Sequence, residues 1–270
     1  MAKISLVGGG GYIGKALQQS LTLVGHEVNQ IQRNESINSF INYGHVIYCS
    51  GITRGDFKRS LHEIVNAHVS NLSKLLSVLH CESFVYLSSA RIYENQISAS
   101  ESSKISSNPL NISDCYNLSK LLGESIVMNS AVNKPSVARI SYVVDGVNDH
   151  FFSPLLQASR SEKVVLSGHH ETKKDFIMLT DVVSCLENIA LRGNSEIYNV
   201  ATGVSISFMQ LKILLEKSLK CIVAFDNDVE KRITPTIDIS KIVSEFGFNP
   251  RDVLGDIEET FMTNLRQLNE

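Results

Sequence analysis

The chain has 270 residues, of which 43% are hydrophobic and 20% are charged, and 25 basic side chains against 28 acidic ones give a net charge of −3. This is an ordinary globular composition, without the basic excess that is typical of nucleic-acid-binding proteins. The first residues lack the pattern of a secretory signal, and no apolar run approaches the roughly 18 residues that cross a bilayer. We therefore expect a cytoplasmic protein that binds neither nucleic acid nor membrane.

Cysteine and histidine residues form no recognisable set of metal ligands. The five cysteines are odd in number and none belongs to a CxxC pair, so we expect free thiols. His169 and His170 are adjacent in a polar loop, without the carboxylate spacing of a metal motif. The sequence therefore predicts no metal.

Short apolar runs alternate with longer segments of helical periodicity in the first half of the chain. This alternation predicts βαβ units and an α/β fold, with a doubly wound parallel sheet of the Rossmann type. The expected strands are residues 3–7, 26–32, 45–50, 83–89 and 136–144, with 196–202 returning to the same sheet. The expected helices are residues 14–24, 56–80 and 114–129.

The regular alternation ends after Asp145. We therefore expect a nucleotide-binding domain and a small C-terminal α/β domain that binds the substrate. Within the second region, Ser207 and Gln210 have the spacing of a capping box at the start of a helix. The predicted division is discontinuous, with residues 1–147 and 175–202 in the first domain and residues 148–174 and 203–270 in the second.

A glycine-rich segment, "VGGGGYIG", follows the first strand and opens the first helix. In its G-x-x-G-x-x-G spacing, Gly8 would make the tight turn, Gly11 would let the backbone approach a pyrophosphate, and Gly14 would let helix pack on strand. The free N–H groups of the helix N-terminus attract phosphate. The segment therefore predicts dinucleotide binding. The further cofactor contacts that we expect are Tyr12, Ile13 and Ser50.

The end of the second strand indicates which dinucleotide binds. An acidic residue there would bind the adenosine ribose hydroxyls and repel a 2′-phosphate. The chain instead has Gln32 followed by Arg33. A guanidinium grips a phosphate with two hydrogen bonds, so this pair favours NADP(H) over NAD.

Tyr116 and Lys120 are an i,i+4 pair on one face of a predicted helix. A tyrosine ordinarily loses its proton near pH 10, and a cation one turn away stabilises the phenolate. We therefore expect Lys120 to lower the pKa of Tyr116 toward the working range of an acid–base catalyst. The buried strand "VYLSS" ends at Ser89, upstream of this helix.

The glycine segment, "SSARIY" and Y-x-x-x-K occur in the order of the extended short-chain dehydrogenase/reductase family, which this chain resembles along nearly its whole length. The family includes nucleotide-sugar epimerases, dehydratases and ketoreductases. The resemblance implies that Ser89 hydrogen-bonds the reacting carbonyl, that Tyr116 transfers the proton and that Lys120 also holds the nicotinamide ribose. It also implies a homodimer, paired through the helices of residues 56–80 and 114–129.

Departures from the family pattern narrow the chemistry. The 4,6-dehydratases place an aspartate and a glutamate directly after the strand hydroxyl, where this chain has Ala90 and Arg91. These residues cannot remove and donate the protons of a water elimination. The fucose-synthase branch has a cysteine at the place of Arg91, and galactose-type epimerases have an acidic second-strand end, unlike Gln32 and Arg33.

Simple carbonyl reduction remains. We expect an oxidoreductase of deoxysugar biosynthesis, a ketoreductase that transfers hydride from NADPH to a nucleotide-linked 4-keto-6-deoxy sugar. A nucleotide-sugar epimerase, a reductase of an unrelated ketone and a non-catalytic NADP-binding regulator stay open as alternatives. Besides Ser89, the expected substrate-binding residues are Arg91, Tyr142, Lys174 and Arg232.

Overall fold

The computed structural model describes residues 1–32, 35–52, 57–112, 114–145, 151–152, 163–166, 168–225 and 231–269. Its centre is a six-stranded sheet of order β2-β1-β3-β4-β5-β9, in which every pair is parallel. The strands are β1 (Lys3–Val7), β2 (Glu27–Ile31), β3 (His45–Tyr48), β4 (Ser83–Ser89), β5 (Pro135–Ile140) and β9 (Ile197–Val200). The predicted Rossmann-type architecture is confirmed.

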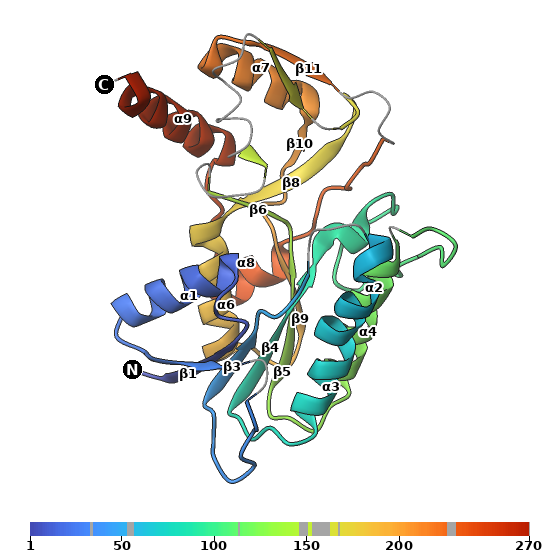
Figure 1. Ribbon diagram of the computed structural model, residues 1–270, viewed down its shortest axis with the longest axis vertical. Helices are drawn as coiled ribbons and strands as arrows, with labels where there is room; N and C mark the ends of the chain where they lie inside the picture. Colours follow the sequence, from blue (N-terminus) through green and yellow to red (C-terminus); the bar gives the residue numbers. More distant parts are fainter. Residues whose placement is uncertain are drawn as a thin grey trace.

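Helices cover both faces of this sheet (Figure 1). On one face lie α1 (Tyr12–Leu23), α6 (Leu179–Arg192) and α8 (Ser240–Phe246). On the other lie α2 (Phe57–Val65), the π-helical segment η1 (Asn66–Ser70), α3 (Asn71–Leu76) and α4 (Asp114–Met128). Because helices bury both faces, the central strands are almost continuously apolar, and β4 is buried from Ser83 to Ser88.

A second group of elements lies above the carboxyl end of the sheet in Figure 1. It contains a three-stranded sheet of order β10-β8-β6 and a parallel pair of β11 with β7. Phe152, Phe176 and Phe208 are central to its separate apolar core. The elements are β6 (Tyr142–Val144), β7 (Lys163–Leu166), β8 (Lys173–Met178), β10 (Ser205–Ser207), α7 (Phe208–Leu219), β11 (Ile222–Phe225) and α9 (Val253–Asn269).

Of the local predictions, one is confirmed and two differ from the structure. The capping box of Ser207 and Gln210 is confirmed at the start of α7. The single strand expected over residues 136–144 is wrong, because the chain leaves the central sheet at Ser141 and continues as β6 in the smaller sheet. The long helix expected over residues 56–80 is interrupted by η1.

The predicted domain boundary at residue 175 falls inside strand β8. Helix α8, from the segment assigned to the substrate domain, packs against β9 and α6, and Ile242 on it belongs to the core of the central sheet. The five cysteines are free thiols. None of the helices in the described ranges combines the length and apolar composition that crossing a bilayer requires.

Candidate active site

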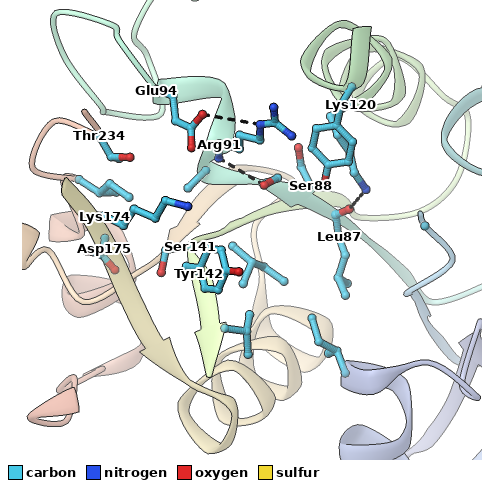
Figure 2. Close-up of a pocket in the computed structure, with 18 of the residues that line it drawn as sticks. Leu87, Ser88, Arg91, Glu94, Lys120, Ser141, Tyr142, Lys174, Asp175 and Thr234 are labelled. Atoms are coloured by element: carbon cyan, nitrogen blue, oxygen red, sulfur yellow. Dashed lines mark hydrogen bonds and ion pairs between the residues drawn. The ribbon is translucent and has the colours of Figure 1, made fainter. Parts of the chain in front are cut away.

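A cavity of about 380 Å³ opens at the carboxyl ends of β3, β4 and β5, and residues of β6 and β8 also line it (Figure 2). This is the edge at which doubly wound sheets bind ligands. The structure brings predicted residues from both regions of the chain to this cavity, while the predicted cofactor contacts Gly8, Gly11, Gly14 and Ser50 are not among its lining residues. The predicted residues that line it are Tyr12, Ile13, Ser89, Arg91, Tyr116, Lys120, Tyr142, Lys174 and Arg232.

The glycine turn has the geometry of a dinucleotide cradle. Gly8 has a φ of +84°, and a Cβ on it would lie 2.7 Å from the backbone nitrogen of Ser50. A Cβ on Gly14 would lie 2.6 Å from the Gly8 carbonyl oxygen, so only glycine allows helix α1 to approach the turn this closely. Gly11 is the N-cap of α1, whose first residues reach the cavity. These residues fit the phosphates of a nicotinamide dinucleotide at a helix N-terminus.

Glu35 places an exposed carboxylate close to the end of strand β2, and it was not among the predicted cofactor contacts. Glu35 accepts a hydrogen bond of 2.8 Å from the backbone N–H of Gln32, directly after strand β2. A carboxylate at this place favours free ribose hydroxyls over a 2′-phosphate. Arg33, on which the expected NADP preference depends, lies outside the described residues. The two residues favour opposite coenzymes.

Ser89 and Tyr116 meet at the floor of the cavity. Strand β4 ends at Ser89, whose Oγ accepts a hydrogen bond of 3.2 Å from the Arg91 backbone N–H and so caps the 3₁₀ segment η2 (Ala90–Tyr93). The Ser89 hydroxyl also hydrogen-bonds the Tyr116 side chain. The two hydroxyl-bearing side chains therefore lie together at the cavity lining.

The pKa of Tyr116 shifts opposite to the direction predicted from its spacing to Lys120. Burial of the phenol raises the pKa above its ordinary value, and this outweighs the lowering by the Ser89 hydrogen bond and by the Arg91 guanidinium. The Arg91 Cζ lies 5.3 Å from the Tyr116 ring centroid. The phenol therefore stays protonated at neutral pH, which is the state of a general acid.

Lys120 lines the same part of the cavity and is 4% exposed. Its Nζ donates a hydrogen bond of 2.8 Å to the Leu87 carbonyl oxygen and lies 5.9 Å from the Tyr116 ring centroid. Burial lowers the pKa of Lys120 to about 7, although the nearby Glu124 raises it. This lysine therefore exchanges between ammonium and amine near neutral pH.

A buried polar network, absent from the sequence predictions, fixes the helix that carries these residues. Ser88 donates a hydrogen bond to Glu124, one turn after Lys120. Glu124 in turn forms an ion pair of 2.7 Å with Arg139 on β5, and Arg139 donates to the Tyr93 hydroxyl. A buried charge pair needs such additional hydrogen bonds to offset its desolvation. The i,i+4 spacing of Lys120 and Glu124 was the available sequence signal.

Three cations line the cavity around the carboxylate of Glu94, namely Arg91, Lys174 and Arg232. Figure 2 shows Glu94 together with Arg91 and Lys174. Glu94 lies 3.7 Å from the Nε of Arg91 and 3.8 Å from an Nη of Arg232. The Nζ of Lys174 lies 4.7 Å from the Tyr142 ring centroid, and burial lowers the pKa of this lysine while Glu94 raises it. The surplus of positive charge suits an anionic ligand. Glu94 was not predicted, because its partner Arg232 is distant in sequence.

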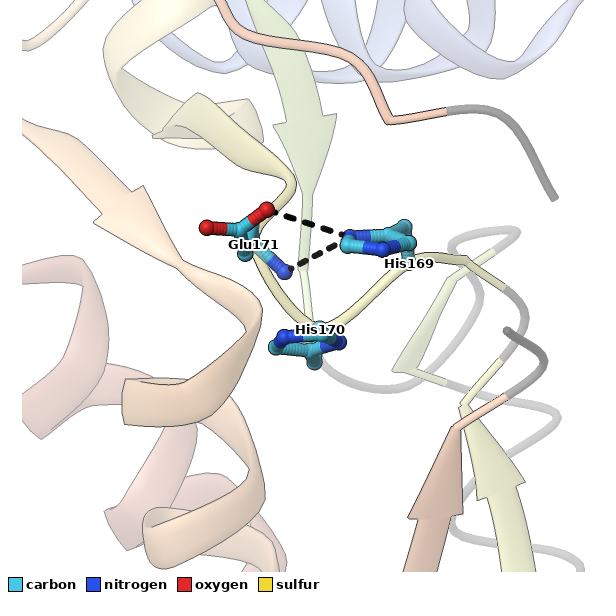
Figure 3. Close-up of side chains that lie close together, drawn as sticks. All are labelled: His169, His170 and Glu171. Carbon is cyan, nitrogen blue, oxygen red and sulfur yellow. Dashed lines mark hydrogen bonds and ion pairs between the residues drawn. The ribbon is translucent and has the colours of Figure 1, made fainter.

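His169, His170 and Glu171 form a cluster outside the cavity lining (Figure 3). The two imidazoles stack with centroids 4.3 Å apart and planes 28° apart, so their nitrogen lone pairs do not converge on one point. The His169 Nδ1 accepts the Glu171 backbone N–H at 3.1 Å, and the Glu171 carboxylate pairs with Lys231 at 3.0 Å. This arrangement differs from the tetrahedral set that a zinc ion requires.

Residues 4–201 match the family model described as the NAD dependent epimerase/dehydratase family. The chain therefore belongs to this family, and the expected resemblance to extended short-chain dehydrogenase/reductases and the expectation of an enzyme are confirmed. No curated protein matches the chain at a significant level.

Solved structures share the fold over the whole chain. MoeE5 in complex with UDP-glucose and NAD is 20% identical, with a TM-score of 0.81 over 99% of this chain and 100% of that one. RMD from Pseudomonas aeruginosa complexed with NADPH is 18% identical, with a TM-score of 0.76 over 98% and 99%. dTDP-glucose 4,6-dehydratase from Bacillus anthracis in complex with NAD is 14% identical, with a TM-score of 0.76 over 98% and 97%. At these identities the likeness establishes the fold.

Proposed function

We propose that this protein is an NADPH-dependent ketoreductase that acts on a nucleotide-linked 4-keto-6-deoxy sugar. The observation that carries the proposal is the buried Tyr116 hydrogen-bonded to Ser89, in a cavity that also holds three cations around Glu94. Burial raises the pKa of the phenol, so that it is protonated at neutral pH. A reductase begins with a carbonyl that must gain a proton, so it needs the phenol rather than the phenolate at the start.

The roles follow from the geometry of the floor. When bound, the reduced nicotinamide supplies the hydride that forms the new C–H bond. The carbonyl oxygen then gains negative charge, and Tyr116 gives it the phenolic proton while Ser89 donates a hydrogen bond to it. The ketone becomes a secondary alcohol, and the Tyr116 phenolate is left beside Lys120, whose pKa near 7 suits proton return.

The carboxylates of the cavity are poorly placed to act as the acid and the base of a water elimination. Of the described residues that line it, the carboxylates are Glu94 and Asp175. Glu94 is paired with Arg91 and Arg232. Asp175 is buried and accepts a hydrogen bond of 3.0 Å from the Thr202 backbone N–H. Ala90 and Arg91 occupy the positions of the dehydratase acid and base, so no carboxylate follows the strand hydroxyl.

The cationic side supports a nucleoside diphosphate as the substrate handle. Arg232 and Lys174 lie on different segments and both face the cavity, which lets them contact separate phosphate oxygens. The bound UDP-glucose of MoeE5, a protein of the same fold, is a ligand of this class. We infer NADPH from Gln32 and Arg33, and the NADPH of RMD is compatible with this fold.

A nucleotide-sugar epimerase is the second candidate, and Glu35 favours it. Its carboxylate after β2 suits NAD, which an epimerase retains and reuses. An epimerase would consume no external coenzyme, whereas a ketoreductase oxidises one NADPH for each sugar. A binding regulator would hold NADPH and turn over neither class of substrate.

The decisive test offers UDP-, dTDP-, GDP- and CDP-linked 4-keto-6-deoxy sugars with NADPH or NADH and follows coenzyme absorbance. We expect one nucleotide series to be reduced, with NADPH preferred. Equal rates with both coenzymes would remove the role given to Arg33. Sugar inversion without coenzyme consumption would establish the epimerase instead.

We also propose a homodimer that pairs through the face of α2 and α4. Val65, Leu118 and Leu122 leave 42%, 39% and 51% of their surface exposed there. Apolar side chains at this exposure on neighbouring helices are typical of helix-bundle interfaces. Sedimentation should give a dimer mass for the native chain and a monomer mass for Leu122→Glu, and a native monomer would contradict the proposal.

A further inference from the structure

His68 lies in the π-helical segment η1, directly under the active site, and is 0% exposed. Wide turns of this kind occur often at functional sites. The segment is held from β3, because the Tyr48 hydroxyl donates a hydrogen bond of 2.6 Å to the Ala67 carbonyl oxygen. Helix α4 packs closely on it, since a Cβ on Gly123 would lie 2.9 Å from the His68 carbonyl oxygen.

The hydrogen bonds of the His68 ring define a single tautomer. The backbone N–H of Ile52 can only donate, and it lies 3.2 Å from Nε2, so Nε2 carries the lone pair. Nδ1 therefore carries the proton and donates to Ser119 Oγ at 2.9 Å. Ser119 in turn donates to the Tyr116 carbonyl oxygen at 2.7 Å. One chain of hydrogen bonds thus connects the turn after β3 to the helix of Tyr116.

The same ring contacts Tyr116 and lies near Lys120. It lies edge-on to the Tyr116 ring, with centroids 5.5 Å apart and planes 82° apart. A Cβ on Gly51 would lie 3.3 Å from His68 Nε2 and 3.4 Å from Lys120 Nζ. Burial, and secondarily Lys120, lowers the pKa of His68 to about 3, which keeps the ring neutral.

We propose that His68 is a positioning residue, which joins the Gly51–Ile52 wall of the coenzyme site to the helix of Tyr116 and Lys120 through one fixed tautomer. The inference rests on the catalytic roles proposed for that helix. Gly51 lines the cavity, so a shift of this turn changes the space beside Lys120. A rigid second layer of this kind holds a catalytic pair in its productive geometry.

The tautomer is tested on the unmodified protein by nitrogen NMR of ¹⁵N-histidine-labelled chain, with the His68 signals assigned by their loss in His68→Gln. We expect a neutral ring with the proton on Nδ1 and no titration between pH 5 and pH 8. A proton on Nε2, or a charged ring in this range, would overturn the proposal even if the variants below fail to fold.

Substitution of His68 by two different amides tests its two ring nitrogens separately. An asparagine amide reaches about as far as Nδ1 and a glutamine amide about as far as Nε2. His68→Asn therefore loses the acceptor for the Ile52 N–H, and we expect NADPH to bind about tenfold more weakly, since a buried unsatisfied donor costs about 1–3 kcal/mol. His68→Gln keeps that acceptor, and it should bind NADPH within about threefold of the native affinity.

The matched control is His62→Gln, on an exposed residue six positions earlier that contacts Asn66. Its NADPH affinity, measured by coenzyme fluorescence, should equal that of the native chain. Equal losses of thermal stability in both His68 variants with native NADPH affinity would reduce His68 to a structural residue. These readouts need no sugar, so failure of the ketoreductase panel would leave them intact and would fail the proposed function alone.

Discussion

The buried Lys120 and the half-buried Lys174 lie at opposite sides of the cavity, and their surroundings differ (Figure 2). Lys120 donates to one backbone carbonyl, faces the rings of Tyr86 and Tyr116, and lies near the Glu124 carboxylate. Lys174 lies over an aromatic ring too, but it shares Glu94 with two arginines.

The two lysines suit different tasks, proton transfer for Lys120 and ligand binding for Lys174. A single buried lysine whose pKa is near 7, such as Lys120, can accept and release a proton at neutral pH. Proton transfer by Tyr116 on the same helix requires such a partner. A group of cations around one carboxylate keeps a surplus positive charge that holds an anion in place. The floor of the cavity therefore suits proton transfer, and the opposite side suits binding of a diphosphate.

Removing the phenol should give the largest effect. Tyr116→Phe is expected to lower kcat by about a thousandfold, because general acid catalysis contributes about 10²–10⁴-fold. NADPH affinity should change little, since the ring remains. Steady-state rates together with a fluorescence titration measure both quantities. Native kcat in the variant would show that the proton comes from another group.

Removing a cation from the group around Glu94 should change binding of the nucleotide sugar instead of turnover. Arg232→Ala is expected to raise KM for the nucleotide sugar about thirtyfold, since a charge-assisted hydrogen bond contributes about 1.5–3 kcal/mol. kcat should stay near its native value. Glu94→Gln, which removes the competing carboxylate, should lower KM. A kcat loss with unchanged KM in Arg232→Ala would erase the distinction between the two sides.

The buried amine of Lys120 should make stability depend on pH. Its folded pKa of about 7 lies below the ordinary 10.5, so between these values the unfolded chain binds the extra proton and stability rises with pH. From pH 6 to pH 8.5 the free energy of unfolding should rise by about 2 kcal/mol relative to Lys120→Met. Urea titrations of both proteins at each pH measure the difference, which would stay constant if Lys120 remained charged.

The smallest effect is expected outside both sides of the cavity. His169→Ala and His170→Ala should change kcat/KM by less than about twofold, as is usual for exposed residues away from a site. Chelating agents should also leave the rate unchanged. A large loss that added zinc reverses would assign the cluster a metal role.

Local sequence patterns predicted the floor well. The turn at Gly8, the end of β4 at Ser89 and the helix of Tyr116 and Lys120 each depend on a few neighbouring residues, and strand order then brings them together. The capping box at Ser207 was predictable for the same reason.

Features set by long-range contacts were missed. Glu94 matters because of Arg232, which is distant in sequence, and Glu124 on helix α4 matters because of Arg139 on strand β5. The departure of the chain at Ser141 into the smaller sheet has no local signal. The pKa of Tyr116 was predicted in the wrong direction, because spacing reveals the nearby cation but not the burial of the phenol.

The most direct measurement follows a deuterium atom from labelled NADPH into the sugar in ordinary water. Reduction of a carbonyl by hydride transfer, with the proton from Tyr116, places one deuterium on the carbon that becomes the alcohol and none on the neighbouring carbons. Proton NMR of the product should therefore lack only the signal of the hydrogen bonded to that carbon. An unlabelled product, or solvent hydrogen at that carbon, would contradict carbonyl reduction by this protein.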